Sequence, residues 1–223
     1  MGRWKIIASG EGGQGVQALA ETLARAAHNA GLSALYIPNF GIEQRGGVSL
    51  AFVQVADGPI GAPKFLTADL VVALSPRSLR RSEQYLGSHS VVLYESSLIE
   101  APQISDEVVG LQSYETIAPE AFAEKTGYRE RQGAVETGSR RVIALAASDL
   151  ARQRLHPRVF NMIILGAIVS ITGVVTLEQV KEALEEKLDR RFRKDPRLRE
   201  HNFAALELGA AAIDEKIREG AHR

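Results

Sequence analysis

The first forty residues carry the pattern that most constrains the fold. A short apolar run at 4–9 ends in a glycine-rich turn and leads into an Ala- and Leu-rich stretch at 16–30 with helical spacing. Gly31 favours the end of that helix, and a second strand is expected at 33–37, ended by Pro38. Strand, helix and strand in this order form a βαβ unit, which predicts a parallel sheet with right-handed crossovers.

The rest of the chain continues this alternation and then becomes helical. Strands are expected at 48–55, 69–74 and 90–94, with a helix at 77–86. Helices are expected at 141–155, 159–171, 176–191 and 195–218, and the third has Thr176 and Gln179 as a capping box. Between them, 108–111 is a possible strand, 119–125 a helix and 126–140 a surface excursion. The predicted fold is α/β: a doubly wound, mostly parallel, Rossmann-like sheet with a helical C-terminal third.

Composition excludes several classes of protein. The 27 basic and 27 acidic residues balance, so we expect no nucleic-acid binding, and the absence of cysteine rules out thiolate-ligated iron–sulfur clusters on this chain. No apolar run approaches the ~18 residues of a membrane span, and strand pattern begins at once, so we expect no signal peptide and a cytoplasmic location. The five histidines are scattered, so we expect no metal site.

The glycine-rich turn is the first candidate site. Gly10, Gly12 and Gly15 satisfy the G-x-G-x-x-G spacing between a strand and a helix, where a phosphate can approach backbone N–H groups. Tight packing of strand against helix also requires glycine, so both explanations remain open. Gln14 could donate its amide to a phosphate or a neighbouring subunit, or face solvent. A dinucleotide site needs an acid after the second strand, but Asn39 stands there, which argues against NAD binding.

Three further segments complete a family pattern. Residues 38–49 read PNFGIEQRGGVS, residues 68–74 read ADLVVAL, and residues 161–167 read NMIILGA. Together with the GGQGV of residues 12–16, they resemble the gamma subunit or domain of 2-oxoacid:ferredoxin oxidoreductases. The order of the segments matches that family from near residue 5 to about residue 210.

The resemblance implies a role inside a larger enzyme. Such enzymes cleave a 2-oxoacid with thiamine diphosphate, release CO2, pass electrons to iron–sulfur clusters and form an acyl-CoA. Thiamine diphosphate, Mg and the [4Fe-4S] clusters are then expected on alpha, beta and ferredoxin-like delta subunits, with FAD on a further NAD-binding subunit left open. The gamma chain is expected to have no catalytic residue and no metal of its own, to cover the active site and to contact coenzyme A.

The same resemblance divides the chain and assigns its site. We expect one domain over 1–223, with a βαβ-rich core at 1–100, an extended insertion at about 115–157 and C-terminal helices at 158–218. The residues expected to contact the cofactor are Gly10, Gly12, Gly13, Gln14 and Gly15. The residues expected to form the interface and active-site cover are Asn39, Phe40, Glu43, Arg45, Gly46 and Gly47.

Several alternatives stay open. Glu43 and Arg45 could grip a partner or a coenzyme A phosphate, or form a salt bridge within the loop. Asn161 could point its amide at the site, but capping the helix that follows is favoured. The basic runs 77–81 and 190–194 are typical of solvated helix faces, although either could meet coenzyme A or an acidic neighbour. A stand-alone NAD(P)-dependent reductase and a purely structural adaptor are the rival functions.

Overall fold

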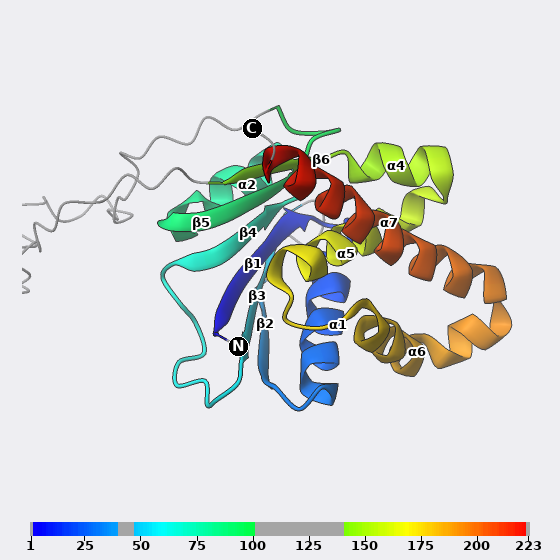
Figure 1. Ribbon diagram of the computed structural model, residues 1–223, viewed down its shortest axis with the longest axis horizontal. Coiled ribbons are helices and arrows are strands. Elements are labelled where there is room, and N and C mark those ends of the chain that lie inside the picture. The colour runs from blue at the N-terminus through cyan, green and yellow to red at the C-terminus, as the bar shows by residue number, and fades with distance from the viewer. Residues whose placement is uncertain (1, 40–46, 101–140, 222–223) are drawn as a thin grey trace, which may run out of the picture.

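The computed structural model describes residues 2–39, 47–100 and 141–221, which form a six-stranded sheet with helices on both faces (Figure 1). The strand order across the sheet is β2-β3-β1-β4-β5-β6. The strands are β1 (Trp4–Glu11), β2 (Ser33–Asn39), β3 (Val48–Ala56), β4 (Ala68–Ala73), β5 (Leu86–Glu95) and β6 (Val142–Leu145). The α/β expectation is therefore confirmed.

The sheet is mostly parallel, as predicted, but its first unit is interrupted. Strands β1, β4, β5 and β6 are parallel neighbours, whereas β3 runs antiparallel to both β1 and β2. Strands β1 and β2 therefore run in the same direction, but β3 lies between them. Strand β3 follows β2 in the chain, pairs antiparallel with it and fills the place next to β1.

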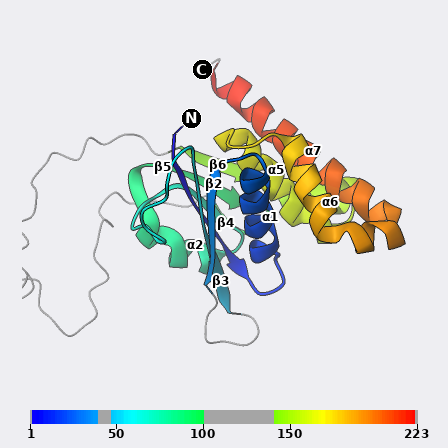
Figure 2. The same ribbon diagram turned by 90° about the horizontal axis from the view of Figure 1, so that it is seen from below.

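The helices divide unequally between the two faces. They are α1 (Val16–Asn29), α2 (Pro76–Ser82), α4 (Ala147–Arg154), α5 (Phe160–Thr172), α6 (Leu177–Lys194) and α7 (Pro196–Ala221). Short 3-10 turns at Glu83–Tyr85 and Pro157–Val159 follow α2 and precede α5. One hydrophobic cluster joins the sheet to α1, α5, α6 and α7, while a smaller cluster joins the other face to α2 (Figure 2). The capping box of Thr176 and Gln179 at the start of α6 is confirmed.

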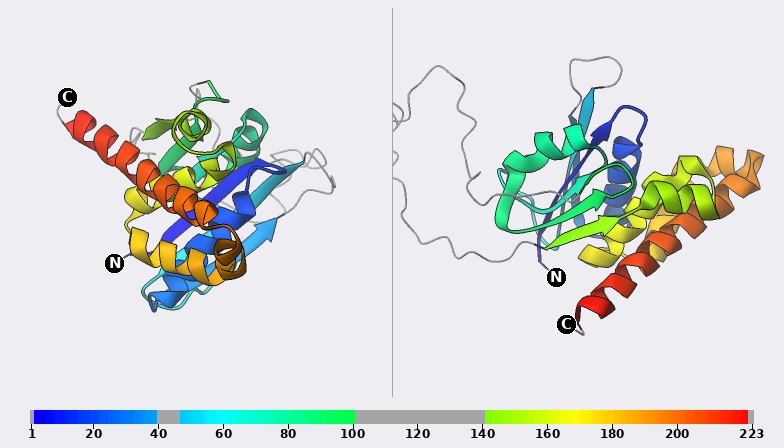
Figure 3. Two further views of the ribbon diagram at one scale, coloured as in Figure 1. Left: turned by 90° about the vertical axis from the view of Figure 1, so that its right-hand side faces the viewer. Right: turned by 90° about the horizontal axis from the view of Figure 1, so that it is seen from above.

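Helices α5 and α7 cross at very short range, and α7 runs across the helical side of the molecule (Figure 3). A Cβ on Gly166 of α5 would lie 2.8 Å from the Leu206 carbonyl carbon, and one on Gly209 of α7 would lie 2.7 Å from that of Ile163. Each glycine thus receives the backbone of the opposite helix. Because α5 is also buried along almost its whole length, this crossing forms the centre of the larger cluster.

Two predicted boundaries are wrong. The helix expected at 141–155 begins only at Ala147, because Val142–Leu145 forms strand β6 and pairs with β5. Its β-branched start fits a strand, but four residues give too short a pattern to distinguish it from a helix. The helix expected at 77–86 ends at Ser82, and β5 already begins at Leu86.

Some expectations fall outside the described residues. The strand near 108–111, the helix at 119–125 and the excursion at 126–140 all do so. Within the insertion expected at about 115–157, β6 and α4 belong to the folded sheet and its helical layer. In the described ranges, no helix combines the length and the apolar character needed to cross a membrane.

Candidate functional site

The glycine turn links the end of β1 to the start of α1. Gly13 and Gly15 have positive φ angles of 94° and 75°, the left-handed region that glycine adopts without a Cβ penalty. Gly15 is also the N-cap of α1, and no side chain caps the helix there. A Cβ on Gly13 would meet nothing within 4 Å, so the space beside it is open. The turn therefore presents exposed backbone at a helix N-terminus.

Gln14 connects the turn to the neighbouring strand. Its amide nitrogen donates to the carbonyl oxygen of Leu74 at 2.9 Å, and its Oε1 accepts from the backbone N–H of Glu11 at 2.6 Å. Leu74 directly follows β4, so the side chain spans the carboxyl ends of β1 and β4. The chain leaves these two strands on opposite faces, through α1 and α2, so this is a topological switch point. Within this chain, Gln14 closes that crevice.

Gly10 and Gly15 are packed, unlike Gly13. A Cβ on Gly10 would lie 2.7 Å from Val16 Cγ2 and 2.8 Å from Gln14 Oε1. A Cβ on Gly15 would lie 2.9 Å from Asn161 Cγ. Packing therefore explains Gly10 and Gly15. It does not explain Gly13, which has no neighbour within 4 Å of a Cβ.

Asn161 does not cap α5. The N-cap of that helix is Val159, without a side-chain hydrogen bond, and Asn161 lies inside the first turn with its amide against Gly15. The capping expectation is wrong, and the alternative, an amide directed at the glycine turn, is what the structure shows. The reason is that the 3-10 turn Pro157–Val159 runs directly into α5, so the helix starts before Asn161.

The two predicted site segments meet at one edge of the sheet. The backbone N–H of Gly12 donates to the carbonyl oxygen of Gly47 at 3.2 Å, and Glu11 pairs with Val48. Asn39, half-buried at the end of β2, pairs with Leu50 of β3. The segment that joins β2 to β3 therefore ends at Gly47 beside the glycine turn and starts one strand farther away, at Asn39. Phe40, Glu43, Arg45 and Gly46 lie outside the described residues.

Gln17 is a site residue that the sequence reasoning missed. Its Nε2 donates to the Leu50 carbonyl oxygen at 2.9 Å and to Ser49 Oγ at 2.6 Å, and its Oε1 accepts from the Tyr36 hydroxyl at 2.7 Å. Burial, and then Glu21, raise the pKa of Tyr36, which keeps that hydroxyl protonated as a donor. Gln17 thus holds α1 across β3 and β2, and no sequence signal marks a glutamine for this role.

The strand order also tests whether the glycine turn could bind a nicotinamide dinucleotide. In a dinucleotide-binding unit the second strand lies next to the first, so its terminal acid reaches a ribose held at the glycine turn. Here β3 lies between them, which places the end of β2 about 10 Å from β1 at the usual strand spacing. Asn39 stands at that end, and Gln14 occupies the switch point. The arrangement therefore does not fit a nicotinamide dinucleotide.

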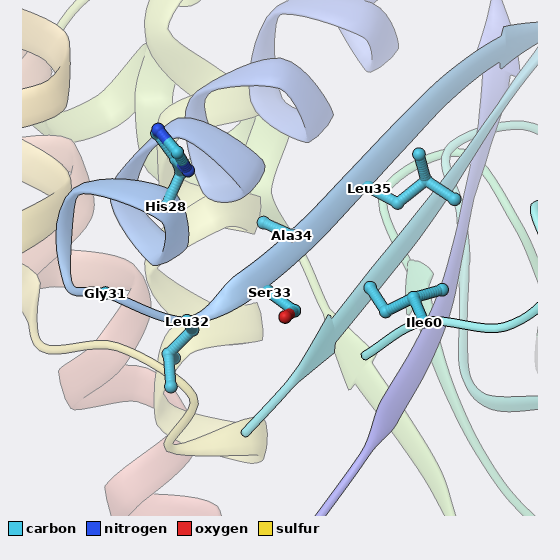
Figure 4. A pocket seen from close by; sticks show the side chains of 7 residues that line it. All are labelled: His28, Gly31, Leu32, Ser33, Ala34, Leu35 and Ile60. Carbon is cyan, nitrogen blue, oxygen red and sulfur yellow. The ribbon is translucent and has the colours of Figure 1, made fainter. Parts of the chain in front are cut away.

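The surface has two hollows, one close to the glycine turn and one far from it. A hollow of about 330 Å³ lies beside the start of β3 and is lined by Val48, Arg77, Arg80, Arg81 and Gln84. A wider pocket of about 480 Å³ lies where α1 ends and β2 begins, and Figure 4 shows His28 and Leu35 among its lining residues. Because α1 starts at the glycine turn and ends at this pocket, the pocket is about 20 Å away from the turn.

The buried carboxylate at this edge of the sheet has a structural role. Across the described ranges, no three His, Asp or Glu side chains gather as a metal site. Glu95 is a fully buried carboxylate at the same edge of the sheet, but it accepts from the backbone N–H groups of Ser97 at 2.9 Å and Ser148 at 3.0 Å. It therefore fastens the start of α4 to the end of β5.

Comparison with known proteins decides the family. The model of the pyruvate ferredoxin/flavodoxin oxidoreductase family matches residues 5–212. The chain belongs to this family. It is similar to a 2-oxoglutarate synthase subunit KorC of Methanothermobacter thermautotrophicus, 27% identical over 97% of this chain and 98% of that one. It is also similar to the common gamma subunit of the pyruvate/ketoisovalerate oxidoreductases of Thermococcus kodakarensis, 29% identical over 79% of this chain and 82% of that one.

The family includes longer chains as well. A ketoisovalerate oxidoreductase subunit VorA of Methanothermobacter thermautotrophicus is 25% identical over 96% of this chain, which spans only 37% of that protein. Among solved structures, the gamma subunit of a keto/oxoacid ferredoxin oxidoreductase from Geobacter sulfurreducens aligns with a TM-score of 0.67 at 23% identity, covering 94% of this chain and 98% of its own. That likeness confirms the fold, and the expected gamma-type recognition is confirmed.

Proposed function

We propose that this chain serves as a gamma subunit that covers the active site of a thiamine-diphosphate and iron–sulfur complex and contacts coenzyme A there. The complex would oxidatively decarboxylate a 2-oxoacid to an acyl-CoA. Thiamine diphosphate supplies the carbanion chemistry, and clusters on other chains carry the electrons. Since this chain has no cysteine, it cannot hold such clusters through thiolates.

One observation carries the proposal: the hydrogen bond from Gly12 to Gly47. It joins the glycine turn to the loop between β2 and β3 at the carboxyl edge of the sheet, where α/β proteins place ligands. The open backbone at Gly13 and the N-terminus of α1 suit a phosphate-bearing ligand such as coenzyme A. A solved relative supports this choice, since a 2-oxoglutarate:ferredoxin oxidoreductase from Magnetococcus marinus contains coenzyme A and succinyl-CoA; it aligns with a TM-score of 0.73 at 19% identity, covering 96% of this chain and 32% of that one.

The contribution of the chain would be positional. Gln14 and Gln17 fix the turn against β4 and β3, so its backbone is presented rigidly without offering an acid or base. A cover of this kind excludes water from a reactive intermediate and prevents its premature protonation. The loop from Asn39 to Gly47 would complete the seal against the neighbouring chain.

The test compares two glycines in the assembled complex. Gly13→Ala places a methyl group in the open space where coenzyme A would approach, and we expect the KM for coenzyme A to rise at least about fivefold, with the complex still assembled. Gly31→Ala is the matched control, because Gly31 also has a positive φ, 80°, and an open surrounding at the other end of α1. It should carry similar backbone strain and leave that KM unchanged.

The outcome separates the rival functions. If Gly13→Ala weakens assembly alone and leaves the KM for coenzyme A unchanged, the chain is a structural adaptor. Arg45→Ala should lower turnover of the complex without unfolding the chain, and full activity in that variant would remove the proposed cover role of its loop. Reduction of NAD by the purified chain alone would revive the stand-alone reductase.

A further inference from the structure

We propose that the basic groove on α2 receives an acidic segment of a partner subunit. The groove is the hollow lined by Val48, Arg77, Arg80, Arg81 and Gln84. The proposal rests on the proposed function, since it needs a partner chain. It adds a second contact that the glycine turn and its neighbouring loop do not provide.

The arginines form one continuous stripe. Positions 77, 80, 81 and 84 are spaced i, i+3, i+4 and i+7, so they share the outer side of α2 and the 3-10 turn that follows. Ser78, Leu79 and Ser82 occupy the opposite side and are buried. All three arginines are exposed, and within the described part of the chain neither Arg80 nor Arg81 forms an ion pair.

Several cations of α6 and α7 are paired, in contrast to Arg80 and Arg81. On α6 and α7, Arg193 bonds Asp189 at 2.8 Å, Lys181 bonds Glu178 and Glu207, and Arg199 bonds Glu185. The formal net charge of the whole chain is zero, so the positive charge of the groove is a local concentration. A patch of one sign on a balanced protein attracts a partner of opposite charge.

The stripe is also held rigidly. Ser9 of β1 donates to the carbonyl oxygen of Val72 at 2.9 Å, and Ser78 of α2 donates to that of Ser9 at 3.2 Å. Ser75 caps α2 in a reciprocal capping box with Ser78. These small buried residues let α2 lie close on the sheet. A fixed helix presents its arginines with less entropy to lose on binding, which favours a recognition role over a mobile solvated face.

The chemistry favours carboxylates on a polypeptide over a small molecule. A small-ligand site encloses most of its ligand and places a few polar groups inside, whereas three of the five residues that line this groove are exposed arginines. Guanidinium groups pair with carboxylates in bidentate fashion at such surfaces. Val48 lies at the end of the loop that is proposed to meet the neighbouring chain, so one partner can engage both surfaces.

The experiment uses the complex with its partner subunits. The chain carrying Arg80→Glu and Arg81→Glu is compared with the natural chain for its affinity to the partners across a range of salt concentrations. We expect about tenfold weaker binding at 0.1 M salt, and a difference that falls below about twofold at 1 M because salt screens exposed charges. Replacing both residues by Lys keeps the charge and should restore most of the affinity.

A matched control carries Arg190→Glu and Arg191→Glu, the same charge change at the exposed end of α6. It should bind as the natural chain does. Unchanged affinity in the Arg80 and Arg81 variant, or a loss that salt does not reduce, would overturn the groove as an acidic docking site. Loss of coenzyme A binding with unchanged assembly would assign the groove to a small anion and overturn it as well. If the natural chain binds no partner subunit at all, the proposed function is wrong, and the inference about the groove falls with it.

Discussion

The crossing of α5 with α7 and the turn between β1 and α1 both depend on glycine, but for opposite reasons. At the crossing, Gly166 and Gly209 are needed because the backbone of the opposite helix occupies the space of a side chain. At the turn, Gly13 is needed for its φ angle, and the space beside it is open. At the crossing, glycine lets two helix backbones come close together, whereas at Gly13 the space beside the backbone stays open, and there we propose that coenzyme A approaches.

This difference separates stability from function. Substitutions at the crossing should unfold the chain, while substitutions at the open position of the turn should change ligand binding first. Substitutions at Gly10 and Gly15 should have effects between these two. Gly10 adjoins the side chain of Gln14 and Gly15 that of Asn161, and either side chain can shift to make room. Substitutions at Gly209, Gly10 and Gly13 test this order from the largest expected effect to the smallest, and an exposed ion pair on α6 gives a still smaller effect for comparison.

Gly209→Ala should be the most damaging change. The added Cβ would lie 2.7 Å from the Ile163 carbonyl carbon, and only a movement of α5 away from α7 would relieve the overlap. We expect the free energy of unfolding to fall by about 3 kcal/mol or more, measured by urea denaturation. Gly61→Ala, with nothing within 4 Å of its Cβ, is the control and should change it by less than about 0.5 kcal/mol. A stable Gly209→Ala chain would refute the close crossing.

Gly10→Ala should have an intermediate effect. The methyl group would press on Val16 and on Gln14 Oε1, which are ends of side chains and not backbone. We expect a loss of about 1–2 kcal/mol in the free energy of unfolding. In a chain that already carries Gln14→Ala the same change should cost less, because one of the two shortest contacts is gone. Strict additivity in this double-mutant cycle would show that Gln14 does not fill the crevice.

Gly13→Ala should lower stability only by about 1 kcal/mol, the usual strain of a non-glycine residue at positive φ. Its free energy of unfolding should match that of Gly31→Ala within about 0.5 kcal/mol, although only Gly13→Ala is expected to affect coenzyme A. Denaturation of the two isolated chains shows whether Gly31→Ala is a matched control for Gly13→Ala. A much larger loss for Gly13→Ala would place it with the packed glycines.

Lys181→Met should have the smallest effect. Hydrogen bonds to Glu178 and then Glu207 raise the pKa of Lys181, although burial opposes them. The partners are largely exposed, so we expect a loss of about 0.5 kcal/mol near neutral pH. Because the pKa is raised in the folded chain, this stabilisation is complete below the ordinary lysine pKa of about 10.4 and disappears as the pH rises through the higher folded value. Denaturation curves at increasing pH should therefore converge for the two chains.

The order of helices and strands along the chain could be predicted from the sequence, but which strands lie side by side in the sheet could not. Periodicity and glycine positions located β1, α1 and α6, because those signals are local. That β3 lies between β1 and β2 depends on strand pairing over long distances, and nothing in residues 48–55 expresses it. The four-residue strand β6 was missed because so short a segment carries no period.

The sequence predicted which residues form the candidate site better than it predicted what each of them does. The turn and the loop after Asn39 were identified from composition and resemblance, and Gly12 and Gly47 do meet. The internal bonds of Gln14 and the position of Asn161 against Gly15 depend on tertiary contacts between β4, α1 and α5. The sequence left two roles open for Asn161, and its alternatives for Gln14 did not include the internal bonds that the structure shows.

The most direct test of the central claim is mild affinity purification of this chain from its native host, with mass spectrometry of the proteins that accompany it. The account predicts recovery with thiamine-binding and cysteine-rich, ferredoxin-like subunits in a complex that converts a 2-oxoacid and coenzyme A into an acyl-CoA. Recovery as a stable homo-oligomer with no such partners would contradict the account and favour a protein that acts alone.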